Sequence, residues 1–123
     1  QLSYSGVLLG ENVTIAAGAI ICAHSTIQDN VIINTGAIVD HETIIKNGAH
    51  IAPGAKLAGR VEVGKKAFIG IGSSVIEGSA VGENSILGAG SVLLEKIPMN
   101  VIAVGVPARV IKKMAAEDIL KKN

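Results

Sequence analysis

Residues 31–54 read VIINTG, AIVDHE, TIIKNG and AHIAPG, four consecutive units of six residues that share one pattern. The third residue of each unit is Ile or Val, and the last is Gly in three of the four. The pattern extends without insertion back to Val7 and forward to Lys96, which makes fifteen units. In all of them the third residue is Leu, Ile or Val, and the sixth is Gly seven times and Asn three times. The architecture of the chain follows from this repeat.

The six-residue period excludes helices and favours short strands. A period of six keeps no set of residues on one helical face, and Gly at this frequency destabilises a helix. In a strand, by contrast, the first and third residues of a unit point to the same side, because side chains alternate. The Gly or Asn at the end of the unit supplies a turn, since these residues tolerate positive φ. The repeat therefore predicts an all-β fold of short strands and corners, with strands stacked about 4.8 Å apart.

The composition agrees with a repeat architecture. The chain has 123 residues, enough for one domain. Aromatic residues make up 2% and Trp is absent, yet 49% of residues are apolar. Small and branched aliphatic residues must therefore fill the core in a regular array, where an ordinary core uses large rings.

Charge and cysteine content exclude several functional classes. The net charge of +1 gives no reason to expect a nucleic-acid partner. The single cysteine, Cys22, has no partner for an internal disulfide, and we interpret it as a small buried or half-buried filler rather than a thiol nucleophile. No apolar run approaches the roughly 18 residues of a membrane span. Because the first residues show no signal peptide either, the sequence predicts a cytoplasmic location.

The repeat also divides the chain. Residues 1–6 form a short lead-in, and a start at Gln1 rather than Met favours a missing N-terminal portion. Residues 7–96 form the repeat, and residues 97–123 form a C-terminal region. In that region we expect a strand over Val101–Val106 and a short helix over Met114–Lys122. Because a repeat fold needs a cap, this region is expected to close one end of the stack.

His41 is the main candidate for chemistry. It lies at a predicted corner, in the only stretch where Asp, His and Glu are adjacent: Asp40, His41 and Glu42. An imidazole can take a proton from an amine or a hydroxyl near neutral pH, and a neighbouring carboxylate can orient the ring. Either Asp40 or Glu42 could serve as that carboxylate. The alternative is that His41 is a solvated corner residue.

Three stretches resemble one family of hexapeptide-repeat proteins. They are INTGAIVDHE at residues 33–42, NGAHIAPGAKLAG at residues 47–59 and VGVPARVIKK at residues 104–113. They are similar to the sugar O- and N-acetyltransferases of the sialic-acid and bacillosamine type. The resemblance implies a left-handed parallel β-helix with eighteen residues per coil, and hence about five coils followed by a strand and helix tail. Members of this family usually begin with a small βαβ domain for a UDP-sugar, which this sequence lacks.

The resemblance also implies an activity and a set of site residues. It implies transfer of an acetyl group from acetyl-CoA to an amine or hydroxyl of a sugar, expected to be nucleotide-linked, without a metal. His41 would be the general base and Glu42 would raise its basicity, with Asn34 and Asp40 near the substrate. The residues that would line the acetyl-CoA groove between two subunits are His50, Gly59, Ile71 and Ala89. The basic tail, with Arg109, Lys112 and Lys113, would meet the coenzyme phosphates or simply be solvated.

An eighteen-residue coil sorts the outward side chains into faces. One face carries Thr14, Ile32, His50, Phe68 and Ile86, and it is largely apolar. Such a face is better suited to packing than to solvent, so we expect a homotrimer through it. In the same stack Glu42 lies between His24 and Arg60, so it could instead form a surface ion pair with Arg60.

Three other functions fit the same scaffold. A γ-type carbonic anhydrase binds zinc through three histidines, but His24, His41 and His50 lack the close His pair of that family. A non-catalytic trimerising scaffold is the second alternative. A diaminopimelate-pathway acetyltransferase is the third, and the VDHE sequence at residues 39–42 argues against it.

Overall fold

A computed structural model describes residues 5–118, and in it every repeat unit forms one two-residue strand. Each unit contributes its second and third residues to the strand, and the remaining four form the corner. The fifteen strands are β1 (Leu8–Leu9), β2 (Thr14–Ile15), β3 (Ile20–Ile21), β4 (Thr26–Ile27), β5 (Ile32–Ile33), β6 (Ile38–Val39), β7 (Ile44–Ile45), β8 (His50–Ile51), β9 (Lys56–Leu57), β10 (Glu62–Val63), β11 (Phe68–Ile69), β12 (Ser74–Val75), β13 (Ala80–Val81), β14 (Ile86–Leu87) and β15 (Val92–Leu93).

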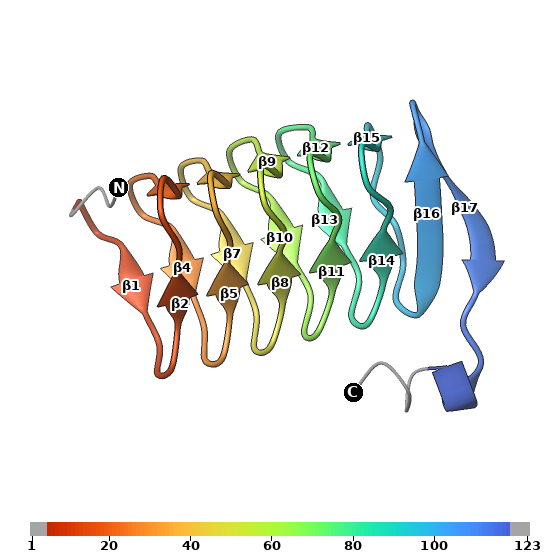
Figure 1. Cartoon of the computed structure of the whole chain (residues 1–123), viewed down its shortest axis with the longest axis horizontal. Coiled ribbons are helices and arrows are strands. Elements are labelled where there is room, and N and C mark those ends of the chain that lie inside the picture. Colours follow the sequence, from red (N-terminus) through yellow and green to blue (C-terminus); the bar gives the residue numbers. More distant parts are fainter. Residues whose placement is uncertain (1–4, 119–123) are drawn as a thin grey trace.

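The strands stack into three parallel sheets that form the sides of a prism of about five coils (Figure 1). The first sheet has the order β1-β4-β7-β10-β13, and the third has the order β15-β12-β9-β6-β3. The second sheet runs β2-β5-β8-β11-β14 and continues into two further strands. Neighbouring strands among these fifteen are offset by eighteen residues, as Phe68 and Ile86 are. The predicted all-β class, coil length and number of coils are confirmed, and so is the shared face of Thr14, Ile32, His50, Phe68 and Ile86.

The sixth residue of each unit turns the chain through a left-handed backbone conformation. All sixth positions from residue 12 to residue 90 have positive φ. Gly adopts this conformation without steric cost, whereas other L-residues pay on the order of 1 kcal/mol or more. His24, Glu42, Arg60 and Lys66 nevertheless occupy such positions, with φ between 57° and 61°. Three of these four, His24, Glu42 and Arg60, stack along a single corner of the prism.

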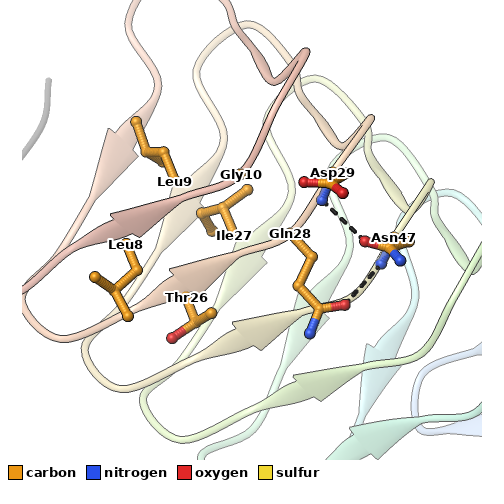
Figure 2. A pocket seen from close by; sticks show the side chains of 8 residues that line it. All are labelled: Leu8, Leu9, Gly10, Thr26, Ile27, Gln28, Asp29 and Asn47. Carbon is orange, nitrogen blue, oxygen red and sulfur yellow. Dashed lines mark hydrogen bonds between the residues drawn. The ribbon is translucent and has the colours of Figure 1, made fainter.

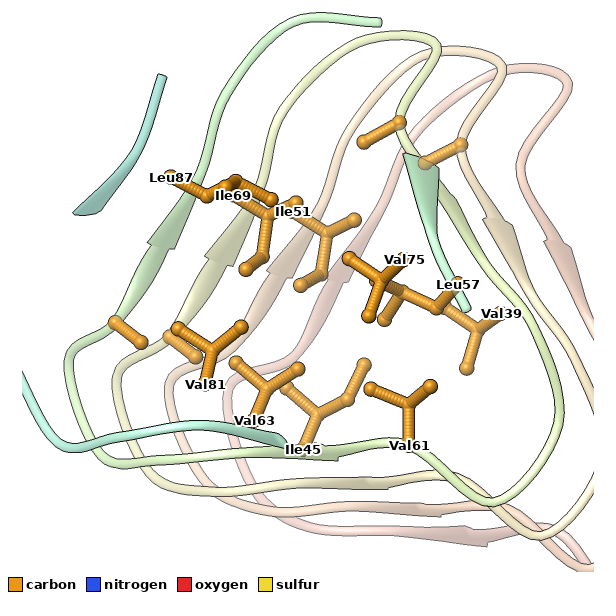
Figure 3. Close-up of a cluster of buried hydrophobic side chains, with 14 of the residues drawn as sticks. Val39, Ile45, Ile51, Leu57, Val61, Val63, Ile69, Val75, Val81 and Leu87 are labelled. Carbon is orange, nitrogen blue, oxygen red and sulfur yellow. The ribbon is translucent and has the colours of Figure 1, made fainter. Parts of the chain in front are cut away.

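First and third residues point inward and fill the prism (Figure 3). Ile33, Ile45, Ile51 and Ile69 are fully buried third residues, one above another in their sheets. Burying an aliphatic side chain of this size contributes roughly 1.5–3 kcal/mol, so the columns provide most of the stabilisation. The first positions hold smaller residues, among them six buried serines and threonines: Ser25, Thr43, Ser73, Ser79, Ser85 and Ser91.

The C-terminal region extends the second sheet with a hairpin. After Ile97, which bridges to Val81, β16 (Val101–Gly105) pairs in parallel with β14. The sequence predicted this strand but not β17 (Ala108–Lys113), which pairs antiparallel with β16. A two-residue turn at Val106 and Pro107, joined by a cis peptide bond, reverses the chain between them.

The chain after β17 is only partly described. Met114 is buried, and its N–H donates to the Asn100 carbonyl. Residues 116–118 form one helical turn, and the rest of the helix expected over Met114–Lys122 lies outside the described residues. Within residues 5–118 no helix is long and apolar enough to cross a membrane.

Candidate active site

His41 lies at the corner where the chain passes from β6 in the third sheet to β7 in the first. Its Nδ1 is 3.0 Å from Glu42 Oε1, and 39% of the His41 side chain is exposed. A carboxylate only accepts hydrogen bonds, so this contact places the ring proton on Nδ1. Nε2 then keeps its lone pair and can accept a proton from a bound substrate.

Gly59 lies directly against the imidazole, one coil further along the stack. A Cβ atom on Gly59 would be 2.5 Å from His41 Nε2. The backbone also links the two corners, because the Arg60 N–H donates to the His41 carbonyl at 2.9 Å. Gly59 does not have positive φ, so a side chain here is disfavoured by the imidazole beside it and not by the backbone conformation.

Asp40 and Glu42, the two candidate orienting carboxylates, have different partners. Asp40 Oδ1 accepts the backbone N–H of His41 at 2.7 Å, so it holds the main chain, while Glu42 contacts the ring. Asp40 is also close to Cys22. Burial raises the pKa of the Cys22 thiol, and the charge of Asp40 and its hydrogen bond raise it further. The thiol therefore stays protonated near neutral pH, which argues against a nucleophilic role.

Arg60 joins Glu42 to a second carboxylate. Its guanidinium is 3.2 Å from Glu42 Oε1 and 2.6 Å from Glu77 Oε2. Glu42 therefore makes both of the contacts expected from the sequence, one with the imidazole and one with Arg60. The four side chains form a continuous exposed line along the corner: His41, Glu42, Arg60 and Glu77.

Asn34 and His50 form a second group on the second sheet. Asn34 Oδ1 accepts the N–H of Thr35 at 2.8 Å, which turns its amide nitrogen toward His50 Nε2 at 3.2 Å. The proton of a neutral His50 is then on Nδ1. Phe68 packs edge-on against the ring, with centroids 5.1 Å apart, and burial lowers the pKa of His50. A depression of about 340 Å³ is lined by His50, Ile32, Gly48, Lys66, Ala67, Phe68 and Ile86.

Ile71 and Ala89 lie one coil apart on the corner between the second and third sheets. The Ile71 side chain is 60% exposed, which is unusual for a bare aliphatic residue at a corner. One chain thus brings together His41, Glu42 and Gly59, and separately Asn34 and His50, while Ile71 and Ala89 occupy a different corner.

Comparisons with known proteins agree with this architecture. Residues 60–95 match the family "Bacterial transferase hexapeptide (six repeats)", and residues 3–23 match "Hexapeptide repeat of succinyl-transferase". No curated protein sequence gives a significant match. Among solved structures, a GDP-perosamine N-acetyl transferase from Caulobacter crescentus, in complex with CoA and GDP-perosamine, is 44% identical over 90% of this chain and 52% of its own, with a TM-score of 0.89.

The chain forms a hexapeptide-repeat β-helix that is similar to those of sugar acetyltransferases. The acetyltransferase domain of PglB from Neisseria gonorrhoeae, in complex with acetyl coenzyme A, is 34% identical over 89% of this chain and 53% of its own, with a TM-score of 0.88. A maltose O-acetyltransferase from Clostridium difficile is 25% identical over 88% of this chain and 71% of its own, with a TM-score of 0.77. This β-helix spans about half the length of the perosamine and PglB structures.

The histidines of this hexapeptide-repeat β-helix do not converge. His24 is on the same corner as His41 but one coil earlier, and its ring lies against Gly6. His50 is on another side of the prism. In the described part of the chain, no three His, Cys, Asp or Glu side chains come together in a way that could hold a metal ion.

A further depression of about 390 Å³ lies at the first coils, away from His41 (Figure 2). Two of its backbone N–H groups are paired by contacts between coils. The Asp29 N–H donates to Asn47 Oδ1 at 2.9 Å, and the Asn47 N–H donates to Gln28 Oε1 at 3.2 Å. None of the residues predicted to form the site lines this depression.

Sequence reasoning missed Glu77, which pairs with Arg60. It also missed the buried hydroxyls of Ser25 and Thr43, which bond the corners that carry His41 and Gly59 respectively. Glu77 is separated from Arg60 by seventeen positions, almost one coil, so the eighteen-residue spacing could have found it. The hydroxyls occupy first positions of the repeat, where Ser and Thr read as ordinary small core residues.

Proposed function

We propose that this β-helix catalyses the transfer of an acetyl group from acetyl-CoA to an amine, or a hydroxyl, of a nucleotide-linked sugar. The observation that carries the proposal is the exposed His41–Glu42 pair, with Nδ1 bonded to the carboxylate and Nε2 left as an acceptor. The similarity to a GDP-perosamine N-acetyl transferase and to an acetyl-coenzyme A complex of PglB supports the choice of substrates.

In the proposed reaction, His41 is the general base. Its Nε2 takes a proton from the sugar amine as the nitrogen attacks the thioester carbonyl, which forms a C–N bond and a tetrahedral intermediate. The intermediate collapses with cleavage of the C–S bond, and His41 returns its proton to the sulfur of coenzyme A. Glu42 stabilises the imidazolium that forms between these steps. Positioned base catalysis of this kind contributes about 10²–10⁴-fold.

The second group of residues fits the acyl donor. A neutral His50 with its proton on Nδ1 can donate a hydrogen bond to the coenzyme or to the thioester oxygen. We propose that the chain forms a homotrimer through the second sheet, so that His50 and Asn34 of one subunit approach His41 of its neighbour. Gly59, Ile71 and Ala89 would then line the coenzyme groove at that boundary. We place the protein in the cytoplasm, since its one cysteine needs no oxidising compartment.

The test is an acetyl-transfer assay on the wild type and on His41→Ala. Thiol release from acetyl-CoA is measured with GDP-perosamine and a panel of UDP-linked amino sugars as acceptors. His41→Ala should lower kcat by about 10²–10⁴-fold, with the oligomeric state unchanged in light scattering. His24→Ala, on the same corner one coil earlier, is the control. Near-normal turnover by His41→Ala would rule out His41 as the base.

A further inference from the structure

One buried hydroxyl holds both ends of the corner that carries His41 and Glu42. Ser25 is fully buried at the first position of its unit, beside this corner. Its Oγ donates to the Asp40 carbonyl at 2.9 Å and accepts the N–H of Thr43 at 3.3 Å. The two residues between those contacts are His41 and Glu42. The hydroxyl therefore closes the two-residue loop that presents the imidazole and its carboxylate.

Thr43 repeats the arrangement one coil further on. Its Oγ1 donates to the Ala58 carbonyl at 3.3 Å and accepts the N–H of Val61 at 3.4 Å. The two residues enclosed this time are Gly59 and Arg60. These two corners contact each other directly, because the His41 ring rests on Gly59 and Arg60 pairs with Glu42.

The clamp is absent from the next corner of the same column. The first residue that would hold Glu77 and Gly78 is Val61, which has no hydroxyl. Serine or threonine is thus present at the two successive positions that support the proposed site. The corner also needs support, since Glu42 has a φ of 58° and its side chain is about half exposed. Packing alone cannot fix such a side chain.

We propose that Ser25 and Thr43 are positioning residues for acetyl transfer, and that their hydroxyls hold His41, Glu42, Gly59 and Arg60 in register. This inference rests on the proposed function. The clamp sets the path of the main chain, and the main chain sets where Nδ1 of His41 meets Glu42. Loss of either hydroxyl loosens that contact and lowers the fraction of His41 that is ready to accept a proton at Nε2.

The chain supplies a matched control. Ser85 Oγ donates to the Pro98 carbonyl at 2.6 Å and accepts the N–H of Val101 at 3.0 Å, so it clamps Met99 and Asn100 at the C-terminal end. Ser25→Ala and Ser85→Ala remove the same pair of hydrogen bonds from different corners. Other units carry Ala and Val at the first position, so both Ser25→Ala and Thr43→Val are compatible with the fold.

Kinetics separate a positioning role from a structural one. We expect Ser25→Ala and Thr43→Val to lower kcat by about 10-fold or more, with the KM for acetyl-CoA within about twofold. Ser25→Thr, which restores a hydroxyl, should return to within about threefold of the wild type. Ser85→Ala should lower the melting temperature about as much as Ser25→Ala while kcat is retained. If kcat of Ser25→Ala matches that of Ser85→Ala, the proposal is overturned.

A readout without turnover separates this proposal from the proposed function. Side-chain ¹⁵N NMR of His41 should show the Nδ1-protonated tautomer in the wild type and in Ser85→Ala, and a mixture of tautomers in Ser25→Ala. An unchanged tautomer in Ser25→Ala would overturn the clamp. A wild type that acetylates no acceptor, together with a tautomer change in Ser25→Ala, would refute the proposed function and support the clamp.

Discussion

At the scale of single residues, Glu42 combines a strained backbone position with two charged or polar partners. It adopts a left-handed backbone conformation, and one of its oxygens meets both His41 and Arg60. A glycine would occupy the corner at lower steric cost, so we expect the Glu42 side chain to have a role other than stabilising the fold. Its contact with His41 points to that role, which is to fix the orientation of the imidazole.

Glu42→Gln should therefore affect activity more than stability. The amide oxygen can still accept from Nδ1, but it lacks the charge that stabilises an imidazolium. We expect kcat to fall by about 10-fold or more, with a change in unfolding free energy below about 1 kcal/mol, because exposed ion pairs contribute little. Glu77→Gln, which removes the other partner of Arg60, is the control. Equal kcat values for the two variants would contradict an orienting role for Glu42.

His50 should make stability depend on pH. Burial lowers its pKa in the folded state below the ordinary value of 6.5, so the unfolded chain binds the proton more readily. The stabilising contribution is present above about pH 6.5 and is lost as the pH falls toward the folded pKa. Urea unfolding at pH 7.5 and at pH 5.5 measures the loss, and His50→Gln should reduce it. An identical loss in the variant would mean that His50 is not the group responsible.

The sequence could not distinguish Asp40 from Glu42, because both are adjacent to His41. The backbone separates them. Asp40 is an outward fourth residue whose carboxylate folds back onto the next N–H, whereas the left-handed turn at Glu42 directs its side chain to the ring. This difference depends on the backbone conformation of two corner residues, so it cannot be deduced from the residue types alone.

At the scale of the elements, the third position of the repeat predicted all fifteen strands and their inward columns. β17 was missed, because its residues alternate poorly and only its first residue, Ala108, is buried. The sequence predicted a strand that ends at Val106, whereas β16 ends at Gly105 and the next two residues, Val106 and Pro107, form the turn of a hairpin. The repeat predicts strand positions only as far as Lys96, and the C-terminal hairpin lies beyond it.

The columns predict a sharp contrast between two isoleucines. Ile51 is fully buried at a third position, while Ile71 is 60% exposed at a fifth. We expect Ile51→Ala to lower the free energy of unfolding by about 2–5 kcal/mol, the usual cost of a cavity of this size. Ile71→Ala should change it by less than about 0.5 kcal/mol. Denaturant unfolding of both variants checks the contrast, and similar losses would contradict the assignment of inward columns.

At the scale of the whole molecule, the second sheet differs from the first. Its outward residues include Ile32, Phe68 and Ile86 around His50, whereas in the first sheet the apolar Leu8 and Ile44 alternate with the polar Thr26 and Glu62. The sequence predicted the apolar face of the second sheet once the coil length was assumed. Within one chain, the groups around His41 and His50 lie on different sides of the prism.

The proposed homotrimer gives a direct prediction. Phe68→Glu would place a charge in the centre of the apolar face, so the trimer should dissociate by light scattering or sedimentation. Thr26→Glu, at the equivalent position of the first sheet, should leave the assembly intact. A trimer that survives Phe68→Glu would mean that subunits associate through another surface.

The strict coil length has a further consequence for how such a chain can change in evolution. A deletion of one residue would move every later side chain to a different position in its unit, and a deletion of six would move each later unit to a neighbouring side of the prism. Only the gain or loss of eighteen residues preserves the columns, as the pairing of Leu8 with Thr26 illustrates. The repeat region is therefore expected to change in length by whole coils, because the loss or duplication of one coil leaves the remaining inward columns in register.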